Sequence, residues 1–293
     1  MSTESSLRAG IVEVGRRMYA RGYTASNDGN ISVRLGHDRL LMTPRSVCKG
    51  FMSPDVMCVT DLQGTRLQGD REPSSEMLMH LEVYRQRPDV QAVVHAHPPT
   101  ATGFAVAGIP LDRAVLAEVL TTLGSIPIAA YATPSTEELP AAVGKYIKAH
   151  DGMLLANHGA LTVGSDLFGA YYKMETIEHF ARISLVARLL GGENLLAREE
   201  VTRLQQLRGA YGITAPAPIC PDPPAPGELP SGGQDPATCQ VVQAPAGDGL
   251  RLVPDGSVPR PPSARPRTDD DAEIRLTYRE LSALIEDAIR HLR

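Results

Sequence analysis

Val93-Val94-His95-Ala96-His97-Pro98-Pro99 places two histidines one residue apart at the end of a β-branched run. The Pro-Pro pair stops the predicted strand, because proline has no backbone N–H for a sheet ladder. Successive side chains of an extended chain point to opposite faces, so His95 and His97 share one face. The spacing favours two ligands of one metal ion, and two chance histidines at a strand end fit the same pattern.

The chain before this strand is predicted to form a helix and then an antiparallel meander. Apolar residues recur at helical spacing over residues 7–21, and Gly22 ends that helix. Strands leading to Arg34, over 40–44 and over 55–61 are joined by short turns, which favours antiparallel pairing. The turn at 26–30 offers backbone N–H groups to an anion, although an ordinary hairpin turn has the same composition.

A second candidate anion site lies at the start of the next predicted helix. Ser74 or Ser75 is predicted to cap this helix. Glu76 then falls in the first turn, where the positive helix end favours a carboxylate. Most such glutamates only stabilise a helix start, so its role depends on what lies nearby.

The rest of the first 210 residues alternates between predicted helices and strands. They are helical pieces over 100–123 broken at 108–110, a strand at 126–130, a helix at 137–149, a strand at 153–156, and helices at 166–190 and 198–209. His158 follows the strand that ends at Ala156, and Gly159 lets it reach a shared site. Three histidines with an open position form a catalytic metal arrangement, most often for zinc. Glu76 could then move a proton beside a carbonyl that the metal polarises.

Composition narrows the class of protein. The 293 residues carry a net charge of -5 without a Lys/Arg-rich block, which argues against nucleic-acid binding. We find no apolar run of about 18 residues that could cross a membrane, and no apolar segment typical of a signal peptide. The four cysteines show no C-x-x-C spacing and indicate free thiols in a reducing compartment. We expect a cytoplasmic protein with no nucleic-acid or membrane partner.

These motifs resemble those of the class II aldolase/adducin family, whose type members are the L-fuculose-phosphate and L-rhamnulose-phosphate aldolases. The resemblance covers about residues 7–212, with the motifs in family order and at family-like spacing. The matching stretches are 26–33 (SNDGNISV), Thr43-Pro44, 73–76 (PSSE), 93–97 (VVHAH) and 157–161 (NHGAL).

The resemblance implies an α/β fold, with a central, mainly antiparallel sheet in a three-layer αβα arrangement, and a homotetramer. It implies one Zn²⁺ per subunit held by His95, His97 and His158. Glu76 would be the acid/base carboxylate and would also bind the metal in the resting state. Tyr211 matches a C-terminal catalytic tyrosine of the family. The substrate phosphate would be held by Gly29, Asn30, Ser74 and Ser75. Arg45 and Ser46, in the loop after Thr43-Pro44, are further phosphate-binding candidates, and Arg45 could instead bind a different anionic head group.

The implied reaction is reversible cleavage of a (deoxy)ketose 1-phosphate, such as L-fuculose 1-phosphate or L-rhamnulose 1-phosphate, to dihydroxyacetone phosphate and lactaldehyde. Two departures limit this expectation. Arg45-Ser46 replaces the Thr-Gly of the family's fuculose-phosphate aldolases, and residues 100–125 contain no tyrosine near Leu116, where those aldolases place a proton donor. Sister reactions therefore stay open: methylthioribulose-phosphate dehydratase, phosphotetronate decarboxylase or pentulose-phosphate 4-epimerase.

The composition changes after the predicted catalytic domain, residues 1–212. Residues 213–270 hold 14 of the chain's 24 prolines and are predicted to be a disordered linker. Residues 271–293 are predicted to contain an amphipathic helix that starts with a Thr277/Glu280 capping box. This helix resembles the encapsulation peptides of bacterial microcompartment enzymes, which implies that 277–293 binds a shell or cargo protein in the microcompartment lumen. Docking onto the chain's own domain is the alternative.

Overall fold

The computed structural model describes residues 3–210, 213 and 217–219. Tyr211 and the predicted C-terminal helix lie outside the described residues. So does the predicted linker, apart from 213 and 217–219. Within the described part, no helix is both long and apolar enough to cross a membrane.

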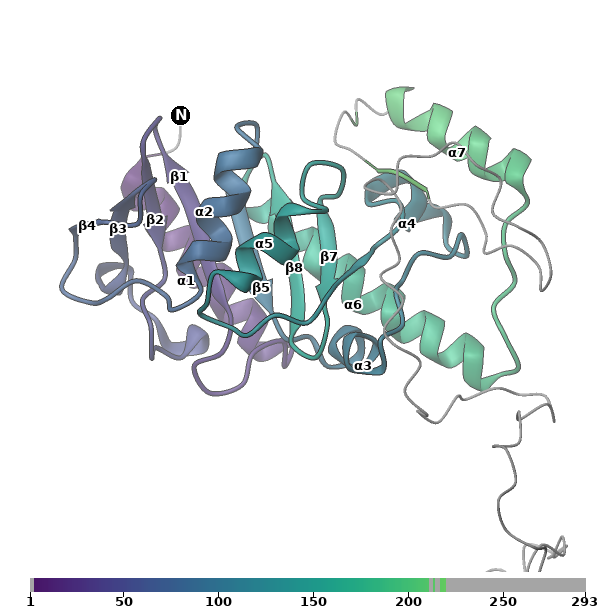
Figure 1. Ribbon diagram of the computed structural model, residues 1–293, viewed down its shortest axis with the longest axis horizontal. Helices are drawn as coiled ribbons and strands as arrows, with labels where there is room; N and C mark the ends of the chain where they lie inside the picture. The colour runs from purple at the N-terminus through teal and green to yellow at the C-terminus, as the bar shows by residue number, and fades with distance from the viewer. Residues whose placement is uncertain (1–2, 211–212, 214–216, 220–293) are drawn as a thin grey trace, which may run out of the picture. The chain divides into compact units, whose positions relative to one another are not determined.

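Eight strands form one sheet in the order β4-β3-β2-β1-β5-β8-β7-β6 (Figure 1). Every neighbouring pair is antiparallel except β6 and β7, so the prediction of a mainly antiparallel sheet is confirmed. The strands are β1 (Asn30–Leu35), β2 (Arg39–Met42), β3 (Cys58–Asp61), β4 (Arg66–Gln68), β5 (Ala92–Ala96), β6 (Ile128–Ala129), β7 (Gly152–Leu155) and β8 (Gly159–Gly164).

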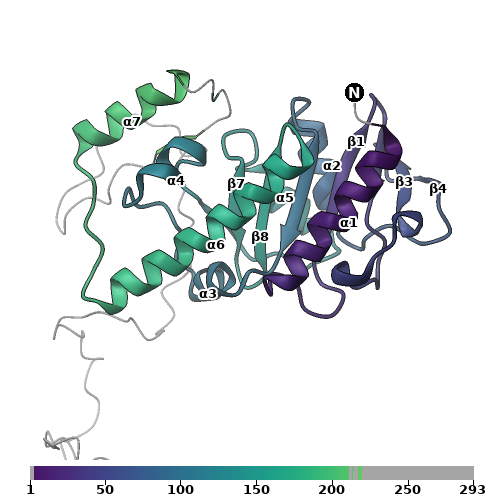
Figure 2. The same cartoon turned by 180° about the vertical axis from the view of Figure 1, so that it is seen from behind.

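Helices cover both faces of the sheet, which confirms the three-layer arrangement. The helices α2 and α5 lie on one face (Figure 1), and α1 and α6 lie on the other (Figure 2). The helices are α1 (Glu4–Ala20), α2 (Met77–Gln86), α3 (Pro99–Ala107), α4 (Ala117–Thr122), α5 (Glu138–Gly144), α6 (Leu167–Leu189) and α7 (Arg198–Ala210), with short 3-10 helices at Lys49–Phe51 and Pro54–Val56.

Alternation along β5 decides which face receives the histidines. Val94 belongs to the apolar core that also contains Ile177 of α6. Val93 belongs to the opposite core, which includes Met79 of α2. His95 follows Val93 at strand spacing and therefore faces the α2 side of the sheet.

Two strands were missed by the sequence analysis. Both β4 and β8 form, and β8 pairs with β5 on one side and β7 on the other. The first residues of the strand predicted at 55–61 form a 3-10 turn instead, because Pro54 cannot extend a ladder. The signal for β8 is weak, since Gly159 and Gly164 disfavour a strand locally.

The predicted capping of α2 was wrong. Glu76 is the N-cap residue and no side chain caps this helix end. The Ser74 hydroxyl accepts the Glu76 N–H (3.3 Å) and its carbonyl accepts the Met77 N–H (3.1 Å). These two bonds form a turn just before the helix, so Glu76 sits at the helix entrance rather than inside the first turn.

A buried ionic cluster centres on Asp151, which precedes β7. Its Oδ1 lies 3.0 Å from Arg87 Nη2, and its Oδ2 accepts from Lys173 Nζ. Arg87 also pairs with the exposed Asp89 (2.7 Å) and donates to the Ile147 carbonyl (3.0 Å). Both oxygens of the buried carboxylate are therefore matched to cations of the chain itself.

Candidate active site

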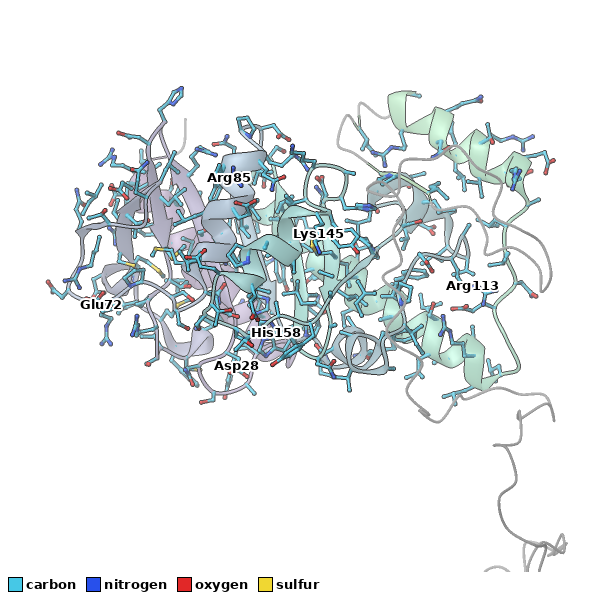
Figure 3. All side chains as sticks on the ribbon, viewed as in Figure 1. Asp28, Glu72, Arg85, Arg113, Lys145 and His158 are labelled. Atoms are coloured by element: carbon cyan, nitrogen blue, oxygen red, sulfur yellow. The ribbon has the colours of Figure 1, made fainter. Side chains whose placement is uncertain are left out.

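Three histidine rings meet at one edge of the sheet. The ring centroids lie 4.9 Å (His95–His97), 4.7 Å (His95–His158) and 5.1 Å (His97–His158) apart. Each offers one ring nitrogen, and these nitrogens all lie within 4.8 Å of one another. Figure 3 shows His158 near Asp28 at this edge. The structure thus brings together all three predicted ligands.

Contacts at Nδ1 orient the two histidines of β5. His95 is fully buried, and its Nδ1–H donates to the Ala160 carbonyl (2.9 Å). His97 Nδ1 lies 3.5 Å from the Asp28 carboxylate, and its backbone N–H donates to the Tyr23 carbonyl (2.9 Å). An acceptor at Nδ1 leaves Nε2 as the free lone pair of a neutral imidazole, as metal ligands require.

The turn between β7 and β8 carries His158. Asn157 adopts a left-handed conformation (φ 56°), which asparagine tolerates better than most residues. At Gly159, a Cβ would lie 2.5 Å from the Ala96 carbonyl oxygen and 2.6 Å from His97 Cδ2. Only glycine lets the start of β8 approach β5 this closely, and that approach brings His158 to the other two rings.

Glu76 enters the histidine cluster from the start of α2. Its Oε1 lies 3.0 Å from His158 Nε2, and its Oε2 lies 3.3 Å from His95 Nε2. Burial raises the pKa of Glu76, but His95 and His158 more than offset this and hold the pKa far below its usual range. Burial and the two neighbouring histidines lower the pKa of His97 to about 3, so this ring is neutral near pH 7.

These residues fit a divalent metal. Within the part of the chain that the structure describes, the buried Glu76 Oε1 has no hydrogen-bond partner. His95 Nε2 and His97 Nε2 face each other at 3.1 Å, although both are needed as acceptors when Nδ1 carries the proton. A cation among these atoms would satisfy them together. Three imidazoles and a carboxylate are a zinc-type donor set.

Three loops adjoin the histidine cluster, and they carry the residues predicted to bind phosphate. The Thr43 hydroxyl accepts the Ile31 N–H (3.0 Å), and the Thr43 carbonyl accepts the Ser74 N–H (3.2 Å). These bonds tie the turn at 26–30 to the loops at 43–46 and 73–75. The side chains of Arg45, Ser46 and Ser75 are exposed, whereas Gly29 and Ser74 are buried. The Asn30 amide is directed at Glu76 instead, with Nδ2 donating to Oε2 (2.8 Å).

Sequence reasoning missed two charged residues here. Asp28 was quoted only as part of the turn, but it contacts His97. Lys49 is fully buried, and its Nζ donates to the carbonyls of Asn27 (2.8 Å) and Val47 (2.7 Å). Burial lowers the pKa of Lys49 to about 8. A lysine inside the apolar run VCKGF was the available signal, because a buried lysine needs a specific partner.

The fold and these motifs agree with a known family. The profile of the "Class II Aldolase and Adducin N-terminal domain" matches residues 9–185. The chain belongs to the class II aldolase and adducin family. The family resemblance inferred from the sequence motifs is therefore confirmed.

Several members of this family are similar over most of their length. A 3-oxo-tetronate 4-phosphate decarboxylase of Pectobacterium atrosepticum is 30% identical over 190 residues, 64% of this chain and 87% of the relative. A 5-methylthioribulose-1-phosphate/5-deoxyribulose-1-phosphate aldolase of Rhodospirillum rubrum is 31% identical over 216 residues, 74% and 97% respectively. The solved structure of an L-fuculose 1-phosphate aldolase superposes with a TM-score of 0.65 at 30% identity, covering 70% of this chain and 97% of that one. All three relatives are lyases.

Proposed function

We propose that the chain is a zinc-dependent aldolase that cleaves a (deoxy)ketose 1-phosphate, such as L-fuculose 1-phosphate or L-rhamnulose 1-phosphate, to dihydroxyacetone phosphate and lactaldehyde. The position of Glu76 is the observation that supports this most. Its carboxylate lies among three histidines and beside three loops suited to an anion. A proton-transfer group, a metal site and a phosphate site then lie within reach of one small substrate.

The substrates named for the relatives share one fragment. L-Fuculose 1-phosphate and 3-oxo-tetronate 4-phosphate both carry a phosphorylated CH₂, then a carbonyl, then a hydroxyl-bearing carbon. In both cases, breaking the C–C bond on the far side of the hydroxyl-bearing carbon from the carbonyl yields dihydroxyacetone phosphate. The second product is an aldehyde in one case and CO₂ in the other. The common fragment is therefore the part that the metal, Glu76 and the loops would recognise.

Zn²⁺ held by His95, His97 and His158 would act as a Lewis acid on the substrate carbonyl. In cleavage, the C4 hydroxyl loses its proton, the C3–C4 bond breaks, and its electron pair stays on C3. Glu76 delivers a proton to C3 and takes it back in the reverse direction. We assign Tyr211 to the proton exchange at the C4 oxygen, from its match to the family's tyrosine.

Gly29, Ser74 and Ser75 would hold the phosphate through the turn and the helix entrance. Asn30, which donates one amide hydrogen to Glu76, would give its second amide hydrogen to the phosphate. Arg45 and Ser46 lie exposed on the adjoining loop. The guanidinium of Arg45 can pair with phosphate in a bidentate way. Lys49 adds a buried positive charge beneath the turn at 26–30, where its Nζ donates to backbone carbonyls. No carboxylate of the described residues lies within ion-pair distance, so this charge is not neutralised.

Decarboxylation of a phosphorylated keto acid is the second candidate. Loss of CO₂ needs no proton donor on a departing oxygen, and residues 100–125 hold no tyrosine to serve as one. Decarboxylases are also among the similar proteins. Methylthioribulose-phosphate dehydration and pentulose-phosphate 4-epimerisation are the other sister reactions that the same groups could support.

One assay tests the aldolase and decarboxylase readings together. Dihydroxyacetone phosphate release is followed for fuculose 1-phosphate, rhamnulose 1-phosphate and 3-oxo-tetronate 4-phosphate, alongside metal content. We expect bound zinc and release from a ketose phosphate with lactaldehyde as co-product. CO₂ from the keto acid alone would replace the aldolase with the decarboxylase. Protein with no bound metal would exclude both.

We also propose a cytoplasmic homotetramer whose residues 277–293 bind a microcompartment shell or cargo protein. The family resemblance supports the tetramer, and the sequence pattern of the predicted domains 1–212, 213–270 and 271–293 supports the role of the tail. Native mass determination tests the tetramer. A chain ending at Gly212 should keep zinc and activity but lose co-localisation with shells, and unchanged localisation would contradict the proposed role of the tail.

A further inference from the structure

A buried chain of hydrogen bonds runs from Glu76 into the layer between the sheet and α2. Asn30 Nδ2 donates to Glu76 Oε2 (2.8 Å), and Asn30 Oδ1 contacts His80 Nε2. His80 Nδ1 lies 2.7 Å from Ser32 Oγ, which lies 2.9 Å from Tyr84 Oη. Ser32 and His80 are fully buried, and Asn30 and Tyr84 nearly so. Nothing in the proposed reaction uses His80, Ser32 or Tyr84.

In this hydrogen-bond network, every group can donate toward Glu76. A carboxylate only accepts hydrogen bonds, so the Asn30 NH₂ must face Glu76 and the Asn30 carbonyl must face His80. His80 then carries its proton on Nε2 and accepts at Nδ1 from the Ser32 hydroxyl. Ser32 has one proton to give, so Tyr84 donates to Ser32 Oγ. Burial and the nearby His95 lower the pKa of His80 to about 3, which agrees with a single proton on this ring.

We propose that His80 is a positioning residue: it fixes the Asn30 amide so that Glu76 Oε2 is held and Oε1 faces the reaction. The surroundings of the two oxygens support this, since Oε2 accepts from Asn30, whereas Oε1 is directed into the cluster, 3.0 Å from His158 Nε2, without a well-formed hydrogen bond among the described residues. Without His80, Asn30 Oδ1 loses its donor, and the buried amide is then free to move away from Glu76 in search of another one. Glu76 Oε2 would then lose its hydrogen bond from Asn30, and the carboxylate would leave its place among the histidines.

The catalytic part of this inference rests on the proposed function, so the test uses readouts that need no substrate. Glutamine can donate to Asn30 and accept from Ser32 as neutral histidine does, whereas leucine can do neither. In the full-length protein, His80→Leu should weaken zinc binding about tenfold in competition with a chelator. His80→Gln should keep zinc affinity close to that of the unsubstituted protein. A crystal structure of the metal-free His80→Leu protein should show Glu76 turned out of the cluster.

The matched control is His150, another fully buried histidine, which bonds through Nδ1 to the Ser125 carbonyl and is far from Glu76 in the sequence. His150→Leu should cost stability and leave zinc affinity unchanged. Equal zinc affinity in the His80→Leu and His80→Gln proteins, or an unmoved Glu76 in the crystal, would overturn the inference. If His80→Leu does not fold, Ser32→Ala removes the donor at Nδ1 and gives the same two readouts.

The two proposals fail in different ways. If zinc affinity and Glu76 respond as expected but no sugar phosphate is cleaved, the positioning role stands and the proposed reaction is wrong. If substrates are cleaved at the normal kcat and KM by the His80→Leu protein, the reaction stands and the positioning role is wrong. A fall in kcat with little change in KM is the expected kinetic result.

Discussion

Asp151 and Glu76 are both largely buried carboxylates, but they differ in the groups that contact their oxygens. The two oxygens of Asp151 are matched by Arg87 and Lys173. Glu76 has only histidines and an amide around it, and its Oε1 is without a hydrogen-bond partner in the described residues. A fully paired buried cluster supports the fold, whereas an incompletely paired one costs stability unless something binds there. We therefore expect the Asp151 carboxylate to stabilise the fold and the Glu76 carboxylate to bind a ligand.

The largest effect is expected from breaking the histidine set. His95→Ala should strongly reduce bound zinc from one ion per subunit and abolish dihydroxyacetone phosphate release, because it removes one of the three imidazole ligands and leaves a gap in the buried cluster. Metal analysis after dialysis, together with the release assay, measures this. His37→Ala, at an exposed histidine, is the control and should retain both. Equal zinc content in the two variants would show that the metal lies elsewhere.

Glu76→Gln should lower kcat about 10²- to 10⁴-fold, the usual contribution of a general acid/base. Zinc content should stay near one ion per subunit, since the three histidines are unchanged, although zinc affinity should fall because the charged carboxylate is lost. Steady-state kinetics and metal analysis on the same sample separate the two roles. Glu72→Gln is the control, because Glu72 is exposed and pairs only with Arg66 among the described residues. A kcat within tenfold of the unsubstituted enzyme would remove Glu76 from the proton transfer.

Asp151→Asn tests whether the fully paired carboxylate stabilises the fold. The substitution leaves Arg87 and Lys173 without their buried carboxylate, which should cost about 3–5 kcal/mol of unfolding free energy. Urea denaturation measures this, and zinc content should not change. Asp89→Asn touches the same arginine from an exposed position and should cost at most about 1 kcal/mol. Similar losses in both variants would mean that burial does not distinguish them.

The smallest effect concerns Lys49. Lys49→Met should weaken inhibition by inorganic phosphate about tenfold, because it removes the buried positive charge beneath the turn at 26–30. Because burial lowers the pKa of Lys49 to about 8, its ammonium is charged below that pH and neutral above it. Phosphate inhibition should therefore weaken as the pH rises through about 8. In Lys49→Arg it should stay constant, since a guanidinium keeps its charge. The same pH profile in both proteins would exclude Lys49.

Local patterns in the sequence were sufficient for much of the fold and for the histidine set. His95 and His97 could be placed on one face because alternation is fixed by the extended backbone. The meander of β1 to β3 followed from short turns between short strands. By contrast, β8 was missed because its residues GALTVG favour no element locally and become a strand through pairing with β5 and β7.

The surroundings of Glu76 were beyond the reach of sequence patterns. His80 lies on the α2 face predicted only as an apolar surface, and Ser32 lies on a strand before it. Their contact joins residues far apart in the chain, and no local spacing predicts such a hydrogen bond. Lys49 was missed for the same reason, since its partners are backbone carbonyls in two loops.

The central place of β5 in the sheet has a consequence for how the protein is made. Val93 pairs with Ser32 on one side and Val163 on the other, partners about 60 and 70 residues away. Such long-range pairing is slow, because a large loop must close before contacts form. A nascent chain that has emerged only as far as His97 holds two of the three histidine ligands and lacks His158. Zinc uptake during refolding should therefore lag behind helix formation and report when the last central strand is in place.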